Sequence, residues 1–149
     1  MASSCLLPSV DPSVEDSATA FEAMFAAHGW GKGWRNGIFS FIHYHSNAHE
    51  VLGIAKGQAT VHLGGRGGMD FKLSAGDAVL LPAGTGHQLM SSSNDLLVIG
   101  AYPPGPDRDL MRSGEKDKLG IRQRVRAIRK PATDPIFGAE GPMLPAWDD

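Results

Sequence analysis

The residues best suited to chemistry are three histidines and one glutamate, which occur in two short segments. His43 and His45 stand two positions apart and Glu50 follows them closely, whereas His87 lies in a separate segment. Neutral imidazole nitrogens and a carboxylate oxygen are common ligands of first-row divalent metals. The sequence therefore predicts one divalent transition-metal ion (Fe, Mn, Ni or Zn) bound by His43, His45, Glu50 and His87. On an octahedral ion this set leaves positions open for water, dioxygen or a chelating substrate.

The residues around these candidate ligands indicate how the ligands meet. Residues two apart in a strand point to the same side of a sheet, so His43 and His45 are expected to share a side. Gly57 allows a tight turn, which is expected to pair the strands before and after it as a hairpin. Pro82 ends an apolar run without needing a ladder donor, and the glycines after it permit a backbone path that returns His87 to the interior.

Short apolar segments separated by turn residues fill the middle of the chain. Among its 149 residues are 19 glycines and 10 prolines, and most of the glycines lie between positions 29 and 105. This pattern favours an all-β sandwich or barrel, and the absence of a helix-length segment within it argues against a parallel α/β sheet. The expected strands cover residues 38–44, 51–55, 59–63, 69–73, 77–81, 87–91 and 96–102.

An amphipathic helix is expected before the strands. Asp16 or Ser17 can cap its start, because a short side-chain oxygen accepts hydrogen bonds from unpaired backbone N–H groups. Phe21 and Phe25 share one face of this helix, and Gly29 suits the left-handed position just after its end.

The chain is expected to form one domain, which suits its length. Residues 1–15 predict an N-terminal arm, either loose or laid over the barrel, and residues 16–149 predict a single domain with a barrel core at about 34–103. A second, short helix is expected within residues 118–128, followed by an irregular C-terminal tail.

Composition argues against several kinds of partner. A net charge of −2 suits neither nucleic acid nor an anionic membrane. The basic stretch at 122–130 is either a nucleic-acid-binding face or a solvated helix face, and the mixed charges beside it favour the second.

The single cysteine, Cys5, is either a reactive thiol or without a role, and it cannot form an intrachain disulfide. Together with the absence of a basic, apolar leader, this predicts a cytoplasmic protein.

The two ligand-bearing segments resemble the paired motifs of the cupin superfamily. From Gly37 to Gly57 the chain has the family's glycine, His-x-His, glutamate, glycine spacing, and the second segment matches through His87 but has Ser91 where the family commonly has asparagine. The resemblance implies a jelly-roll β-barrel of roughly six to eight strands, metal-binding roles for the four candidate ligands, and a homodimer. Segments between positions 29 and 147, including 82–87 and 100–103, are similar to the YjlB-like bacterial cupins.

This resemblance implies three possible functions. The first is a metal-dependent enzyme acting on a small polar molecule, either a dioxygenase-type oxidoreductase or an isomerase or decarboxylase. The second is a non-catalytic module that binds or senses a sugar or an organic acid at the metal. The third is a structural protein in which the metal is incidental. Fold alone does not choose among them, and no residue is assigned a catalytic role.

Several other residues have two interpretations. His49 would replace Glu50 as a ligand if the strand bulges, and otherwise supports another group or lies at the surface. His62 is either a ligand or a partnered surface residue. Trp34 and Tyr102 either line the pocket mouth or pack in the core.

Overall fold

The computed structural model describes residues 5–112 and 118–147. The side chain of Cys5 lies outside the described part of the structure. The elements, in chain order, are β1 Cys5–Pro8, α1 Ser17–Ala27, β2 Gly31–Asn36, β3 His43–Tyr44, β4 Glu50–Lys56, β5 Gln58–Leu63, β6 Met69–Ser74, β7 Asp77–Leu81, β8 His87–Ser92, β9 Leu97–Tyr102, β10 Met111–Arg112, α2 Lys118–Ala127 and α3 Met143–Ala146.

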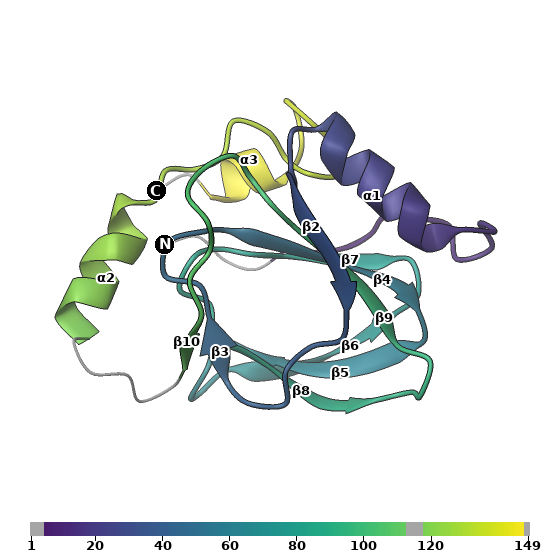
Figure 1. Cartoon of the computed structure of the whole chain (residues 1–149), viewed down its shortest axis with the longest axis horizontal. Helices are drawn as coiled ribbons and strands as arrows, with labels where there is room; N and C mark the ends of the chain where they lie inside the picture. The colour runs from purple at the N-terminus through teal and green to yellow at the C-terminus, as the bar shows by residue number, and fades with distance from the viewer. Residues whose placement is uncertain (1–4, 113–117, 148–149) are drawn as a thin grey trace.

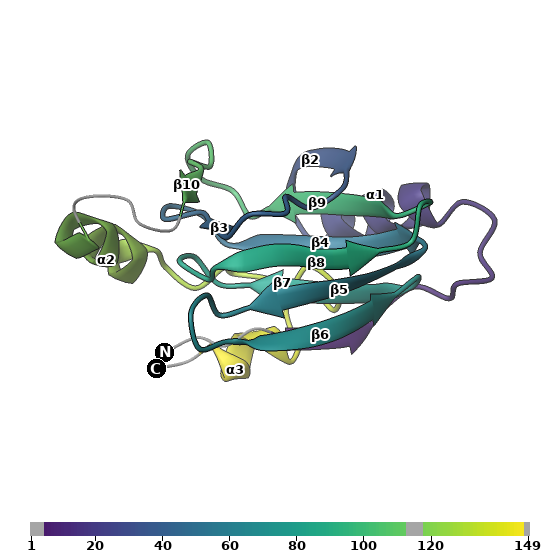
Figure 2. The same ribbon diagram turned by 90° about the horizontal axis from the view of Figure 1, so that it is seen from below.

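The strands form two facing antiparallel sheets (Figure 1). Each sheet has five strands, in the orders β1-β7-β4-β9-β2 and β10-β3-β8-β5-β6. Helices α1 and α3 cover the outer face of the first sheet, and α2 lies at one end of the barrel in both views (Figures 1 and 2). This architecture confirms the all-β jelly-roll fold expected from the sequence.

Strand β4 carries the core because it is buried on both faces. It lies between β7 and β9, and every residue except Lys56 is buried. Leu52 and Ile54 pack between the two sheets, whereas Val51 and Ala55 pack on the outer side against α1 and the C-terminal tail. The alternation of strand side chains thus lets one strand hold the interior cluster and the helix layer together.

Helix α1 confirms its sequence prediction. Asp16 Oδ1 accepts a hydrogen bond from Thr19 N at 3.1 Å, which caps the first turn. Phe21 and Phe25 are buried against the outer face of the first sheet, and their ring centroids lie 5.6 Å apart. The helix ends at Ala27, and Gly29 has a φ of 81°.

The strand expected at 38–44 is wrong over most of its length. Regular pairing begins earlier, in β2 with Gly31, and resumes only at His43. Strand β2 belongs to the first sheet and β3 to the second, so residues 37–42 cross between the sheets. A chain that crosses a barrel corner cannot keep a ladder partner along its length, and here Phe39 O accepts one bond, from Leu89 N.

The hairpin expected around Gly57 is also absent. Gly57 does make the predicted turn, with a φ of 77°. However, β4 pairs with β7 and β9, whereas β5 pairs with β6 and β8, so the turn carries the chain from one sheet to the other. A turn residue fixes a local change of direction but not the partner of the next strand.

Part of the expected N-terminal arm is a strand. Residues Cys5–Pro8 form β1, which pairs antiparallel with β7 at the sheet edge. At the other terminus, helix α2 confirms the short helix expected within 118–128. Within the described residues, no helix has the length and apolar character needed to cross a membrane.

The C-terminal tail is irregular apart from α3, as expected, and it is held by one buried carboxylate. Asp134 Oδ1 accepts hydrogen bonds from Ile136 N (2.7 Å) and Phe137 N (3.1 Å), and Oδ2 accepts one from Met143 N at 3.1 Å. Asp134 is fully buried. Without the carboxylate these backbone donors would lose their acceptor, so Asp134 ties the start of α3 to the preceding part of the tail.

Replacing Asp134 by asparagine should lower the free energy of unfolding by about 1–3 kcal/mol. The amide nitrogen of asparagine cannot accept a hydrogen bond, so at least one of these backbone N–H groups would lose its acceptor. Urea denaturation followed by circular dichroism measures the loss. Exposed Glu140, six positions along the same tail, is the control, and Glu140→Gln should leave stability unchanged. Equal stabilities for the two variants would contradict this role of Asp134.

Candidate metal centre

The four predicted ligands come from both sheets and face the barrel interior. His43 is in β3 and pairs with His87 at the start of β8, while Glu50 begins β4 in the opposite sheet. His45 follows directly after β3. His43, Glu50 and His87 are buried, with Glu50 only 2% exposed, and 10% of the His45 side chain is exposed. The crossing at 37–42 and the turn after β4 are therefore what place these segments opposite each other.

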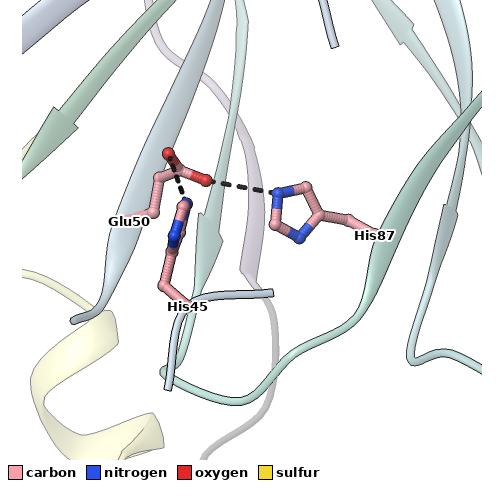
Figure 3. Close-up of side chains that lie close together, drawn as sticks. All are labelled: His45, Glu50 and His87. Atoms are coloured by element: carbon pink, nitrogen blue, oxygen red, sulfur yellow. Dashed lines mark ion pairs between the residues drawn. The ribbon is translucent and has the colours of Figure 1, made fainter. Parts of the chain in front are cut away.

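Three of the four side chains form a tight group (Figure 3). One potential ligand atom from each of His45, Glu50 and His87 lies within 4.8 Å of the others. His45 Nε2 is 3.3 Å from Glu50 Oε2, and His87 Nε2 is 3.3 Å from Glu50 Oε1. His43 is not part of this group, although its ring centroid lies 4.0 Å from that of His87. Its role as the fourth ligand stays a prediction.

The hydrogen bonds of the histidines point their Nε2 atoms toward the centre. The Nδ1 atoms contact backbone carbonyl oxygens: His43 contacts Phe41 O at 2.9 Å, His45 contacts Asp109 O, and His87 contacts Thr85 O at 3.0 Å. A carbonyl oxygen only accepts, so each Nδ1 must carry the hydrogen. In the neutral ring this leaves the Nε2 lone pair for a metal, and the carbonyl fixes the ring orientation.

The donor set fits a divalent cation. Glu50 Oε1 is buried and has no hydrogen-bond donor among the described residues. His87 Nε2 is near it, but in the neutral ring that nitrogen presents a lone pair to the carboxylate oxygen. Lone pairs that face each other in a buried site are unfavourable unless a proton or a cation lies between them. His45, Glu50 and His87 would hold such a cation, with His43 beside them.

The electrostatics of the group follow from burial and from Glu50. Burial, and then the neighbouring His87, lower the pKa of His43 to about 4, so its ring is neutral near pH 7. Burial also lowers the pKa of His45, but the contact with Glu50 outweighs it and raises that pKa above its usual value. Burial raises the pKa of Glu50, yet its contacts with His45 and His87, when their Nε2 atoms carry protons, hold the pKa well below its usual range.

Tyr102 and Trp34 complete the surroundings of Glu50. The Tyr102 hydroxyl donates to Glu50 Oε2 at 2.5 Å and accepts from Trp34 Nε1 at 2.8 Å. The indole lies directly on Gly100, where a Cβ would be 2.1 Å from a ring carbon, so only glycine permits this approach. Both aromatic residues line the pocket. The sequence left packing and pocket lining open for them, and nothing in it links either residue to Glu50.

Asp109 holds one of the candidate ligands in place, and nothing in the sequence indicated this role. Its backbone oxygen contacts His45 Nδ1, and its carboxylate accepts hydrogen bonds from the backbone N (2.7 Å) and the hydroxyl of Ser46. Asn47 Oδ1 in turn accepts from Asp109 N at 2.9 Å. The segment before β10 therefore fixes the His45 ring, although it is 64 positions away in the sequence. No local pattern signals a contact of that range.

The centre opens into a cavity of about 430 Å³, which contains all four predicted ligands. A second cavity, of about 460 Å³, contains none of them and is lined in part by His49. His49 Nδ1 accepts from Ala83 N at 2.8 Å, and Nε2 is 3.0 Å from Arg129 O. Because both ring nitrogens are engaged away from the metal group, His49 does not replace Glu50 and instead supports the backbone.

His62 is a partnered surface histidine and lies outside the centre. Its Nδ1 is 2.7 Å from Asp70 Oδ1, and its Nε2 is 2.7 Å from Gly65 O. Both partners are acceptors, so both nitrogens donate only when the ring is protonated. The hydrogen bond to Asp70, followed by that to Gly65, therefore raises the pKa of His62.

A histidine whose pKa is raised by folding stabilises the protein below its ordinary pKa of about 6.5, and this contribution is lost as pH rises through the raised value. Asp70→Asn should therefore bring the pKa of His62 back toward its ordinary value. An NMR titration of the His62 ring protons measures both pKa values. The same pKa in wild type and variant would contradict the pairing with Asp70.

A match to a known domain family agrees with the fold. The cupin domain family matches residues 36–99. Among solved structures, a TDP-fucose-3,4-ketoisomerase from Campylobacter jejuni has a TM-score of 0.44 and 12% identity over 52% of this chain and 63% of its own. The acireductone dioxygenase of Bacillus anthracis, with cadmium in its active centre, has a TM-score of 0.44 and 17% identity over 60% of each chain. This chain thus spans less than two thirds of either, and at these scores neither indicates what it acts on.

A sequence relative gives the stronger result. The uncharacterized protein YjlB of Bacillus subtilis (strain 168) is 38% identical over 126 residues, which are 85% of this chain and 76% of the relative. That similarity extends well beyond the cupin domain match, into the segments that surround the barrel. The chain therefore belongs to the YjlB-like cupins.

Proposed function

We propose that the chain is a metal-dependent enzyme acting on a small polar molecule. The observation that carries this proposal is the buried pair formed by Glu50 Oε1 and His87 Nε2, which lie 3.3 Å apart, with no hydrogen-bond donor to Oε1 among the described residues. A divalent metal bound there supplies Lewis-acid or redox chemistry. The protein residues hold the ion, orient its ligands and keep the surroundings largely apolar. Dioxygenase-type oxidation, isomerisation and decarboxylation all suit such a centre.

The cavity favours a small-molecule ligand. Its volume of about 430 Å³ lies within the usual range for ligand pockets, and its walls combine apolar side chains with a few polar groups. Tyr102 stays protonated near neutral pH because burial, and then the charge of Glu50, raise its pKa. Its hydroxyl therefore remains a donor to Glu50 while a ligand binds. The homodimer, the cytoplasmic location and the absence of nucleic-acid and membrane partners stay predictions.

The alternative is a non-catalytic module that binds or senses a sugar or an organic acid. A panel of sugars, organic acids, diketones and thiols, incubated with protein loaded with Fe²⁺, Mn²⁺, Ni²⁺ or Zn²⁺, separates the two functions. Turnover that disappears in His87→Ala supports the enzyme. Tight binding without turnover across the panel supports the module. A protein that takes up none of these metals would contradict both.

A further inference from the structure

A cation stands at the mouth of the metal pocket. The guanidinium of Arg108 lies over the ring of Tyr102, with Cζ 4.6 Å from the ring centroid. The hydroxyl of the same tyrosine contacts Glu50, so one side chain links the candidate metal ligand to the arginine. Arg108 lines the cavity that contains the ligand group. The aromatic face orients the guanidinium and leaves its N–H groups available for hydrogen bonds.

The acidic neighbours of Arg108 are engaged elsewhere. Asp107 forms an ion pair with Lys32 at 3.2 Å, and the Asp109 carboxylate is bonded to Ser46. Within residues 5–112 and 118–147, no ion pair joins Arg108 to a carboxylate. Arg35, by contrast, forms an ion pair with Glu22 at 2.5 Å and does not line the cavity. Among the described residues, the positive charge of Arg108 is therefore not balanced by an ion pair.

The charge of the pocket favours an anionic ligand. A divalent ion bound by Glu50 and neutral imidazoles keeps a net positive charge, and Arg108 adds another. Apolar side chains form much of the wall: Ile38 and Leu52 are buried, and Phe39 and Leu110 are about half exposed at the rim. A carboxylate would meet the guanidinium in a charge-assisted, bidentate hydrogen bond, while a short apolar group would lie against the wall. A neutral sugar would satisfy neither feature.

We infer that Arg108 is a specificity-determining residue and that the ligand is a small organic acid, whose carboxylate binds the Arg108 guanidinium while a second oxygen faces the metal group. This inference rests on the metal-dependent function proposed above, and it selects the organic acid among the small molecules considered there. A carboxylate bearing a neighbouring oxygen and a short alkyl chain has the size and charge that this pocket fits.

The test is a binding measurement on Zn²⁺-loaded protein, because zinc has no redox chemistry to consume the probe. The probes are 2-oxobutyrate and 2-hydroxybutyrate, each compared with its primary amide. In the amide an NH2 group replaces one carboxylate oxygen, so the charge and the bidentate acceptor are lost while the oxygen at carbon 2 is kept. The variants are wild type, Arg108→Gln and the control Arg112→Gln. Arg112 stacks on Phe41 at 3.8 Å and does not line the cavity, so it matches the chemistry of Arg108 without its position.

Calorimetry should show that wild type and Arg112→Gln bind at least one acid at least about 10-fold more tightly than its amide. Arg108→Gln should bind that acid about 10-fold or more weakly than wild type, while its affinity for the amide and its zinc content stay unchanged. Zinc content is determined first by mass spectrometry, and circular dichroism verifies the fold of both variants.

The outcomes separate this inference from the proposed function. Stoichiometric zinc together with equal affinity of wild type and Arg108→Gln for the acids overturns the role of Arg108 and leaves the metal centre intact. The role of Arg108 is also overturned, with the metal centre intact, if neither acid binds wild type or if the amides bind as tightly as the acids. Failure to bind zinc overturns the metal centre and this inference with it.

Discussion

In the His87→Ala variant, the affinity for Zn²⁺ is expected to fall at least about 100-fold. Changes to residues that merely orient a metal ligand already cost about 10–100-fold, and His87 is itself a member of the buried group. Its removal also leaves the buried Glu50 Oε1 without the nitrogen that faces it at 3.3 Å. Competition titration with a fluorescent zinc chelator measures the affinity, and mass spectrometry measures the metal retained after purification.

The matched control for this experiment is His62→Asn. It also removes one imidazole, but His62 lies on the surface with Asp70 and Gly65 and is not part of the metal group. Zinc affinity of this variant should equal that of wild type. If folded His87→Ala protein kept wild-type affinity, the metal centre would not be at these residues.

The same titration on His43→Ala decides the fourth ligand. The contact of His43 Nδ1 with Phe41 O leaves the Nε2 lone pair free, and its low pKa keeps the ring neutral. Both properties suit a ligand, and a loss comparable to that of His87→Ala would confirm one. A smaller loss of about 10–100-fold would show that His43 packs against His87 and orients that ring instead, and a loss below about 10-fold would mean that it has neither role.

The Tyr102→Phe variant is expected to bind Zn²⁺ about 10–100-fold more weakly than wild type. Tyr102 donates to Glu50 Oε2 and thereby fixes which oxygen faces His87. Phenylalanine keeps the ring and its packing but removes the donor, so Glu50 would lose one of the contacts that hold its orientation. The visible spectrum of Co²⁺-loaded protein should change as well, since it reports the ligand arrangement directly.

Trp34→Phe provides a graded comparison for this effect. It removes the indole N–H that bonds to the Tyr102 hydroxyl but leaves the contact between Tyr102 and Glu50. Zinc affinity should therefore fall less than in Tyr102→Phe. Wild-type affinity and an unchanged Co²⁺ spectrum in Tyr102→Phe would mean that the metal and the histidines fix Glu50 without help from the tyrosine.

The sequence by itself determined the features that depend on neighbouring residues. The strand period predicted that His43 and His45 face the same side, and both line the cavity. Capping chemistry offered Asp16 or Ser17 as the start of α1, of which Asp16 is the cap, and turn chemistry predicted the reversal at Gly57. The spacing of the histidines and Glu50 also identified the fold family. These signals are local, because each concerns hydrogen bonds or side-chain directions within a few positions.

The tertiary structure decided which distant segments meet. It placed β4 and β5 in opposite sheets, although the turn between them suggested a hairpin. It also brought Tyr102 to Glu50 and the Asp109 carbonyl to His45, across 52 and 64 positions of sequence. Contacts of this range follow from how the two sheets pack over a common core, and the free energy of that packing is shared among many residues. No local pattern therefore shows that a tyrosine holds the glutamate or that an arginine stands at the pocket mouth.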